Sequence, residues 1–280
     1  EFETGNVLIG SVSRLYMSNK CLLIADHKSV DKQIHIFNKN DFSYLTSIGN
    51  FGEGPEEITV MGCLAIDEAH HQLYVSDHAK QKIFSYDMDS VMVDSLYKPQ
   101  VKTAMNETLF PSEYQYINDT LSIAVLIKPT STSTFNQFLG RWNMNTGEMI
   151  PMKYTHPDIQ KKRITFAASE KAGIYVECYT RHDLMTICSL DGELLYNIYG
   201  PDWDGGNGNK LQSFGTVMIG NDKIFVSYCG EDYARDSFPT KILVFDLEGN
   251  YLKTLETGYK ISDCCYDSFN NRIILSLNDV

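Results

Sequence analysis

The stretch IGNFGEGPEEITVMGCLAIDEAHHQLYVSDHAKQKIFSYD, residues 48–87, contains the pattern from which the rest of the chain is built. Residues 64–66, 73–76 and 82–86 have the β-branched and aromatic content and the alternation of strands. A tight turn joins the first two runs, and a polar turn precedes the third. The stretch therefore predicts most of one small antiparallel sheet.

The second of these strands recurs along the whole chain. Leu73-Tyr74-Val75-Ser76 has counterparts that begin at residues 22, 121, 174, 224 and 273, so successive copies lie 48 to 53 residues apart. A period of about 40–50 residues with several short strands is typical of a β-propeller, whose four-stranded sheets bury their faces against one another. The sequence predicts an all-β, six-bladed β-propeller that forms a single domain over residues 1–280.

The composition excludes some partners and some frameworks. The net charge of −12 opposes the electrostatic attraction that drives binding to nucleic acid or anionic lipid. No apolar run approaches the ~20 residues of a membrane-spanning helix. The seven cysteines show no C-x-x-C spacing and lie mostly beside apolar runs, so we predict free, structural thiols. We expect a monomer with no nucleic-acid partner and no membrane insertion.

The two ends of the chain predict how the ring closes. The last blade offers strands at residues 261–265 and 272–276, about two strands short of a complete sheet. Val7, Leu8 and Ile9 would form its outermost strand, which closes the ring and removes an open sheet edge. One strand is then still missing, so either blade six is three-stranded or a C-terminal segment is absent from this chain.

Two further local predictions concern the connections between strands. Residues 92–96 are expected to form the fourth strand of blade two. Asp191-Gly192 in blade four is expected to supply the positive φ angles of a hairpin turn, and Glu248-Gly249 repeats the device in blade five.

The lengths of the connections predict the binding face. With strands lettered A to D from the axis outward, the A–B and C–D turns lie on one face and the B–C and D–A connections on the other. The A–B turns are short, as at residues 118–119, whereas the opposite connections are long, as at 50–57, 200–210 and 229–240. Because binding residues concentrate on long loops held by a rigid scaffold, we expect partners to bind the B–C and D–A face, named here the long-loop face.

Charged and aromatic residues of the long-loop face form the candidate binding site. Glu177 stands out because the equivalent position holds Ala or Ser in the other five blades, and departures from a local rule mark function or strain. Structural roles remain open: residues 51–57 can make a crossing turn, and Glu177 can form a salt bridge. The candidates are Glu53, Glu56, Glu57, Arg163, Glu177, Arg181, Asp202, Trp203 and Tyr233.

Motifs for metal binding or catalysis are weak. Asp202-x-Asp204 suggests calcium, but the remaining ligands of an EF-hand loop are absent from the sequence. Asp26-His27 and Asp77-His78 end equivalent strands; a catalytic pair is needed once, so the repeated pair indicates aspartates that cap turns. The sequence contains no serine-hydrolase, zinc-peptidase or P-loop motif. We predict no catalytic residue, no metal ligand and no cofactor, with calcium as the alternative.

The phrases I-G-x-x-G-x-G-P-x-E (residues 48–57) and L-Y-V-S-D-x-x-x-x-K-I (residues 73–83) resemble NHL-type repeats. They resemble more closely the TolB-like six-bladed propellers of bacterial secreted or lipid-anchored proteins, and the likeness extends over essentially the whole chain. The resemblance implies export and a location in the cell envelope, in the periplasm or at the surface. It carries no catalytic motif to this chain.

Two functions are therefore expected. The first is a non-catalytic binding or scaffold propeller that engages a protein, peptide or glycan through the long-loop face. The alternative is a metal-dependent hydrolase or lactonase with a cation at the mouth of the axial channel, held by carboxylates among Glu53, Glu57, Glu177 and Asp202.

Overall fold

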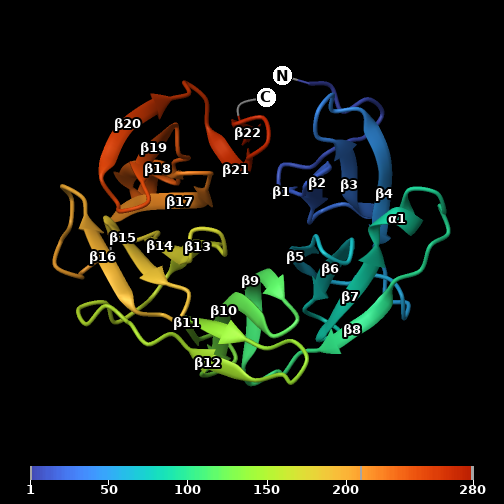
Figure 1. Cartoon of the computed structure of the whole chain (residues 1–280), viewed down its shortest axis with the longest axis horizontal. Coiled ribbons are helices and arrows are strands. Elements are labelled where there is room, and N and C mark those ends of the chain that lie inside the picture. The colour runs from blue at the N-terminus through green and yellow to red at the C-terminus, as the bar shows by residue number, and fades with distance from the viewer. Residues whose placement is uncertain (1, 209, 279–280) are drawn as a thin grey trace. The chain divides into compact units, whose positions relative to one another are not determined.

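The strands form five four-stranded antiparallel sheets and one two-stranded sheet (Figure 1). They are seen in a computed structural model that describes residues 2–208 and 210–278. Each four-stranded sheet contains four consecutive strands in chain order, so each blade is an antiparallel meander. The strands belong to two compact units, Glu1–Phe135 with Gly140–Ile150, and Asn136–Leu139 with Pro151–Val280.

The first unit contains blades one and two and most of blade three. Blade one consists of β1 (Ser13–Met17), β2 (Cys21–Asp26), β3 (Lys32–Asn38) and β4 (Tyr44–Asn50). Blade two consists of β5 (Met61–Asp67), β6 (Gln72–Asp77), β7 (Lys82–Asp87), the helical turn α1 (Met88–Val91) and β8 (Gln100–Ala104). Blade three consists of β9 (Phe110–Asn118), β10 (Leu121–Pro129), β11 (Phe135–Trp142) and β12 (Met149–Pro151).

The second unit contains the remaining sheets. Blade four consists of β13 (Ile164–Ser169), β14 (Ile174–Tyr179), β15 (Leu184–Ser189) and β16 (Leu194–Tyr199). Blade five consists of β17 (Leu211–Ile219), β18 (Lys223–Asp232), the 3-10 turn η1 (Tyr233–Arg235), β19 (Lys241–Asp246) and β20 (Tyr251–Glu256). Blade six consists of β21 (Ile261–Asp267) and β22 (Arg272–Leu277).

The core of each unit lies between neighbouring sheets. In the first unit, Leu23 and Ile36 of blade one pack in one buried cluster with Leu64 and Val75 of blade two. Every residue of β2 and of β14 is buried, which explains why the second strands read as nearly continuous apolar runs. All seven cysteines are buried and free, so the prediction of structural thiols is confirmed.

Aspartates at the ends of second strands cap turns, as predicted. Asp26 accepts hydrogen bonds from the backbone N–H groups of Gly10 (2.8 Å) and Lys28 (3.0 Å). The equivalent Asp77 accepts four, two from the crossing before β5 and two from the turn after β6, donated by Thr59, Val60, Ala79 and Lys80. Each aspartate therefore ties a blade-to-blade crossing to a B–C turn.

The predicted C–D turns are present with one difference. Gly192 (φ +88°) and Gly249 (φ +85°) adopt the left-handed conformation, whereas the preceding Asp191 and Glu248 do not. Gly147 (φ +78°) occupies the corresponding turn of blade three. One residue with positive φ is enough to reverse the chain in each turn, because the hydrogen bond that closes the turn spans more residues than in a two-residue hairpin.

The predicted strand at residues 92–96 is wrong. Asp87 instead accepts a hydrogen bond from the N–H of Ser90 (2.7 Å) and starts α1. The N–H groups of Val93 and Asp94 then bond to the carbonyl of Ser90, so they are used in turns and not in a sheet ladder. The fourth strand is β8, which pairs with β7.

The predicted closing strand of Val7, Leu8 and Ile9 is also wrong. The N–H of Val7 donates to the carbonyl of Thr4 (3.2 Å) in a local turn, and Leu8 is 92% exposed. Gly10 bonds to Asp26 as Thr59 bonds to Asp77, so residues 7–9 correspond to a blade crossing and not to an outermost strand. Within the described residues blade six has two strands. The single domain over residues 1–280 stays a prediction.

Candidate functional site

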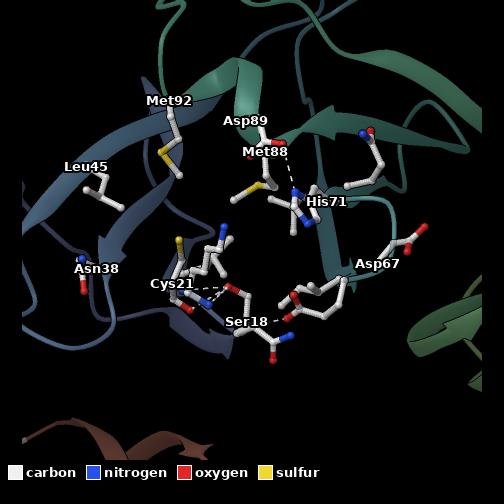
Figure 2. A pocket seen from close by; sticks show the side chains of 16 residues that line it. Ser18, Cys21, Asn38, Leu45, Asp67, His71, Met88, Asp89 and Met92 are labelled. Atoms are coloured by element: carbon white, nitrogen blue, oxygen red, sulfur yellow. Dashed lines mark hydrogen bonds and ion pairs between the residues drawn. The ribbon is translucent and has the colours of Figure 1, made fainter. Parts of the chain in front are cut away.

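A pocket of about 460 Å³ lies between blades one and two of the first unit (Figure 2). It opens on the side of the A–B and C–D turns, opposite to the B–C connections of the same two blades. Its apolar lining consists of Cys21, Leu23, Leu45, Ile66, Leu73, Met88 and Met92. Its polar lining consists of Ser18, Asn19, Lys20, Asn38, Asp67, Glu68, His71, Gln72 and Asp89. The pocket thus combines an apolar interior with a polar rim, as ligand sites commonly do.

The helical turn α1 builds one wall of this pocket. Val91 is 3% exposed and anchors α1 in the core, while Met88 and Met92 pack against the same cluster and line the pocket. The Asp87 cap begins the turn, and the hydroxyl of Tyr97 receives the N–H of Asp87 (2.9 Å). Blade two therefore departs from the tight C–D turn of blades three to five, and this departure supplies the wall.

Hydrogen bonds fix the rim. The Glu68 carboxylate accepts the N–H of Asn19 (2.7 Å), which links the A–B turns of blades two and one. His71 and Asp89 form a pair with Nδ1 and Oδ2 3.0 Å apart, shown as a dashed line in Figure 2. Both of these side chains are more than half exposed. Burial raises the pKa of the Cys21 thiol, so this group is neutral and acts as a small apolar surface.

Asp67, His70 and Asp119 offer a metal-capable grouping beside the pocket. Burial opposes ionisation of Asp67, but hydrogen bonds from His70 and from the Tyr74 hydroxyl (2.8 Å each) outweigh it and lower the pKa of this carboxyl. Blade six has the same turn, in which Asp267 accepts from Asn270. Asp67 and His70 are therefore explained as a hydrogen-bonded A–B turn, while Asp119 accepts from the hydroxyl of Tyr116 in blade three.

The candidate residues of the first unit lie together in the crossing between blades one and two. Glu57 Oε2 accepts the N–H of Gly54 (2.8 Å), and a Cβ on Gly52 would lie 2.0 Å from the same oxygen. Glu56 pairs with Lys98 (2.9 Å), and Glu53 is exposed. These contacts agree with the structural role left open for this loop, in which the glycines let Glu57 close the turn.

Glu177 forms the salt bridge that was the structural alternative. Its carboxylate lies 2.6 Å from Nζ of Lys162, and the two side chains are 2% and 8% exposed. Lys162 also lies 5.9 Å from the centre of the Tyr179 ring. The adjacent Arg163 donates to the carbonyl of Lys162 (2.7 Å). The pair joins the crossing before β13 to β14, in the way that backbone bonds to Asp77 do in blade two.

Arg181 and Tyr233 are brought into contact within the second unit. The guanidinium carbon of Arg181 lies 3.1 Å from the centre of the Tyr233 ring, a cation–π contact. Tyr233 is 49% exposed. The B–C connections of blades four and five therefore meet through these two side chains.

Trp203 and Asp202 lie in the crossing from blade four to blade five. Trp203 packs on Tyr199, His156 and His182, with ring centres 5.0 to 6.0 Å apart. Burial lowers the pKa of His182, because the charged imidazolium loses its hydration. The side chain of Asp202 is exposed, and its N–H donates to Asp183 (3.0 Å). That the candidate residues of both units form one site stays a prediction.

The pocket lining was not among the sequence candidates. Its residues come from four separate parts of the chain, residues 18–23, 38–45, 66–73 and 88–92. The segment after β7 contains the sequence feature that could have predicted the pocket wall. Asp87 precedes Ser90 by three residues, as in a helix cap, and Met88 and Met92 are four residues apart, as on one face of a helix.

Comparison with known proteins supports the fold. A sequence family described as a 6-bladed beta-propeller, DUF5128, matches residues 3–139. No curated protein matches the chain. A protein of Bacteroides fragilis described as exported is 13% identical, with a TM-score of 0.57 over 94% of this chain and 78% of that chain.

Two further solved structures are similar. A member of the DUF4221 family from Bacteroides vulgatus is 11% identical, with a TM-score of 0.61 over 97% of this chain and 88% of that chain. The Cps50 (Swd1) β-propeller domain of Myceliophteria thermophila is 9% identical, with a TM-score of 0.59 over 98% and 96%. At these identities the likeness concerns the fold alone.

The sheets and the comparisons together define an all-β propeller, in which the described part of the chain forms five complete blades and a partial sixth. A propeller fold suggests a binding or scaffold role. Within residues 2–208 and 210–278, no helix is long and apolar enough to cross a membrane.

Proposed function

We propose that this protein is a non-catalytic binding propeller that receives an apolar side chain of a protein or peptide partner in the pocket beside α1. The single observation that carries the proposal is the pocket itself, with about 460 Å³ of space and seven apolar side chains. This volume falls within the range of about 300–1,000 Å³ that is usual for ligand sites. Met88 and Met92 suit such a role because methionine side chains adapt to the shape of a bound group.

The long-loop face is the second candidate. The contact of Arg181 with Tyr233 and the partly exposed Trp203 favour it, because aromatic residues and arginine are enriched at binding hot spots. A protein, peptide or glycan would be its ligand. Glu57 and Glu177 serve local contacts, which makes binding a better proposal than metal-dependent hydrolysis.

The proposal extends to the setting of the protein. We propose that it acts as an exported monomer without a cofactor, related to TolB-like or NHL-type propellers. The resemblance of its repeat phrases and a structural neighbour described as exported support export. Fractionation of the cells that make the protein tests it, and a cytoplasmic location would refute it.

A displayed library of random dodecapeptides, selected on the purified protein, tests the site. Met92→Trp should fill the pocket and abolish binding of the selected peptides. Val30→Trp adds the same ring at an 82% exposed position on the other side of blade one and should leave binding unchanged. Binding that survives Met92→Trp but is lost in Arg181→Ala would assign the function to the long-loop face. Peptides insensitive to both Met92→Trp and Arg181→Ala would refute both sites.

A further inference from the structure

We infer that the pocket beside α1 selects a peptide segment in which an aliphatic side chain stands next to a positive charge. This inference rests on the proposed function, because it concerns what the same pocket prefers. It is carried by the distribution of charge around an apolar interior.

The interior is suited to an unbranched or γ-branched aliphatic group. Leu23 and Leu73 of the second strands line the pocket together with Met88 and Met92 of the α1 segment. Leu23 and Leu73 are 0% and 1% exposed, so the strand side of the wall is fixed by the core. Met88 and Met92 are only partly buried, so the α1 side can adjust.

The rim carries more negative than positive charge. Two exposed carboxylates, from Glu68 and Asp89, line the pocket against one ammonium group, from Lys20, and the carboxylate of Asp67 lines it from a buried position. His71 faces Asp89. The net charge of the whole chain, −12, has the same sign. A concave site with carboxylates on its rim attracts cations and disfavours anions.

The two exposed carboxylates can still accept hydrogen bonds from a ligand. The contact with the N–H of Asn19 uses Oε1 of Glu68, and the contact with His71 uses Oδ2 of Asp89. A carboxylate has two oxygens with about four lone-pair sites, so each group can also accept from an ammonium or guanidinium. Glu68 belongs to the A–B turn and Asp89 to α1, so the two charges flank the opening from different elements.

A peptide fits this surface better than an isolated small molecule. Val93 and Leu96 follow the pocket wall in sequence and are 87% and 83% exposed. They add exposed apolar surface to the segment that follows α1, which also contains Asp94. Large apolar side chains that stay exposed are a feature of interaction surfaces. A chain with alternating aliphatic and basic residues would match both the apolar and the acidic groups.

Methyl NMR of protein labelled with ¹³C-methyl methionine provides the first test. Hexylammonium, hexanol and hexanoate have the same chain length and differ in charge. All three are titrated at pH 7.5 while the signals of Met88 and Met92, assigned through Met→Leu variants, are followed. Hexylammonium should bind most tightly and hexanoate most weakly.

The rim carboxylates are exposed, and this exposure limits how strongly the pocket prefers a cation. An exposed ion pair changes an affinity by about twofold to fivefold. Glu68→Gln and Asp89→Asn should each lower the affinity for hexylammonium by about this factor and leave the affinity for hexanol unchanged. Glu170→Gln, an exposed substitution in blade four, is the control and should change neither. Raising the salt concentration should weaken the binding of hexylammonium and leave that of hexanol unchanged, because screening acts only on charged probes; for hexanoate it should reduce the repulsion by the rim.

The outcomes separate this inference from the proposed function. If hexanol and hexylammonium bind equally, the preference for a cation is overturned while the pocket remains a binding site. If no probe and no selected peptide shifts the Met88 and Met92 signals, the proposed function itself fails. Peptides selected on the protein should pair Leu or Met with a neighbouring Lys or Arg, and a selection without this pairing contradicts the inference. The double variant Val93→Ser with Leu96→Ser should lower the affinity for the selected peptides but not the affinity for hexylammonium. Equal losses of affinity for both would exclude a peptide as the preferred ligand.

Discussion

The buried pair of Lys162 and Glu177 leads to a prediction about the second unit. Replacing Glu177 with Met removes the carboxylate and keeps roughly its length and volume. The ammonium of Lys162 would then be buried, at 8% exposure, without the carboxylate that now lies 2.6 Å from it. Breaking a buried pair by removal of one partner costs about 3–5 kcal/mol, so Glu177→Met should lower the free energy of unfolding by that amount.

The double variant Lys162→Met with Glu177→Met removes both charges. Apolar replacement of a buried ion pair by residues of similar volume is often neutral or stabilising, so the double variant should recover most of the loss. Glu56→Met is the matched control, because the Glu56–Lys98 pair is 42% and 73% exposed. An exposed pair is worth about 0–1 kcal/mol, so this control should change stability little.

Equilibrium urea unfolding, followed by circular dichroism and by tryptophan fluorescence, measures these differences. The reasoning is refuted if Glu177→Met costs less than about 1 kcal/mol. It is equally refuted if the double variant is no more stable than Glu177→Met. The first result would make Glu177 a binding candidate again, since a residue that does not stabilise the fold needs another explanation. The second would show that the loss in Glu177→Met does not come from the unpaired charge of Lys162.

Three further predictions concern the loops. Burial lowers the pKa of His182 below the usual value of about 6.5, so as the pH falls the unfolded chain takes up the proton first and stability is lost below that pH. The fall in Tm from pH 7.5 to 5 should therefore be smaller in His182→Phe than in the unchanged protein. An equal fall in both contradicts the prediction. Gly208→Ala should lower Tm more than Gly205→Ala. Both glycines have positive φ, but only a Cβ on Gly208 would meet the His182 ring, at 1.9 Å. Equal losses of Tm would mean that the backbone conformation alone, and not the contact with His182, causes the loss. Asp87→Ala removes the cap that receives the Ser90 N–H and should cost about 1 kcal/mol in urea unfolding, and no loss would show that α1 does not need its cap.

The strands of the interior could be predicted from the sequence because their environment repeats. The second strands of blades one to five are largely buried on both faces, so their apolar run recurs with a near-constant spacing. The outermost strands lack this signal: β8 has the sequence QVKTA and is largely exposed, so the more apolar residues 92–96 looked like the better strand. The local cap at Asp87 decided the outcome, since it commits the backbone to a turn before the sheet can continue.

The candidate site shows a similar division. The role of Asp77 as a turn cap followed from its repetition, and the salt bridge of Glu177 was one of two open interpretations. The pocket could not be found in this way, because it joins four separate stretches and depends on the register of two blades. Which side chains share a cavity depends on tertiary packing, which no periodicity records.

The placement of α1 between β7 and β8 has a consequence for how such a site can change. The segment lies outside the ladders, since β7 still pairs with β6 over its length and with β8 through residues 82–85. Substitutions or insertions in residues 88–99 can therefore remodel one opening while the hydrogen bonds of the sheet stay as they are. In an otherwise repetitive scaffold, a single lengthened turn gives one blade an individual specificity and leaves the shared framework intact.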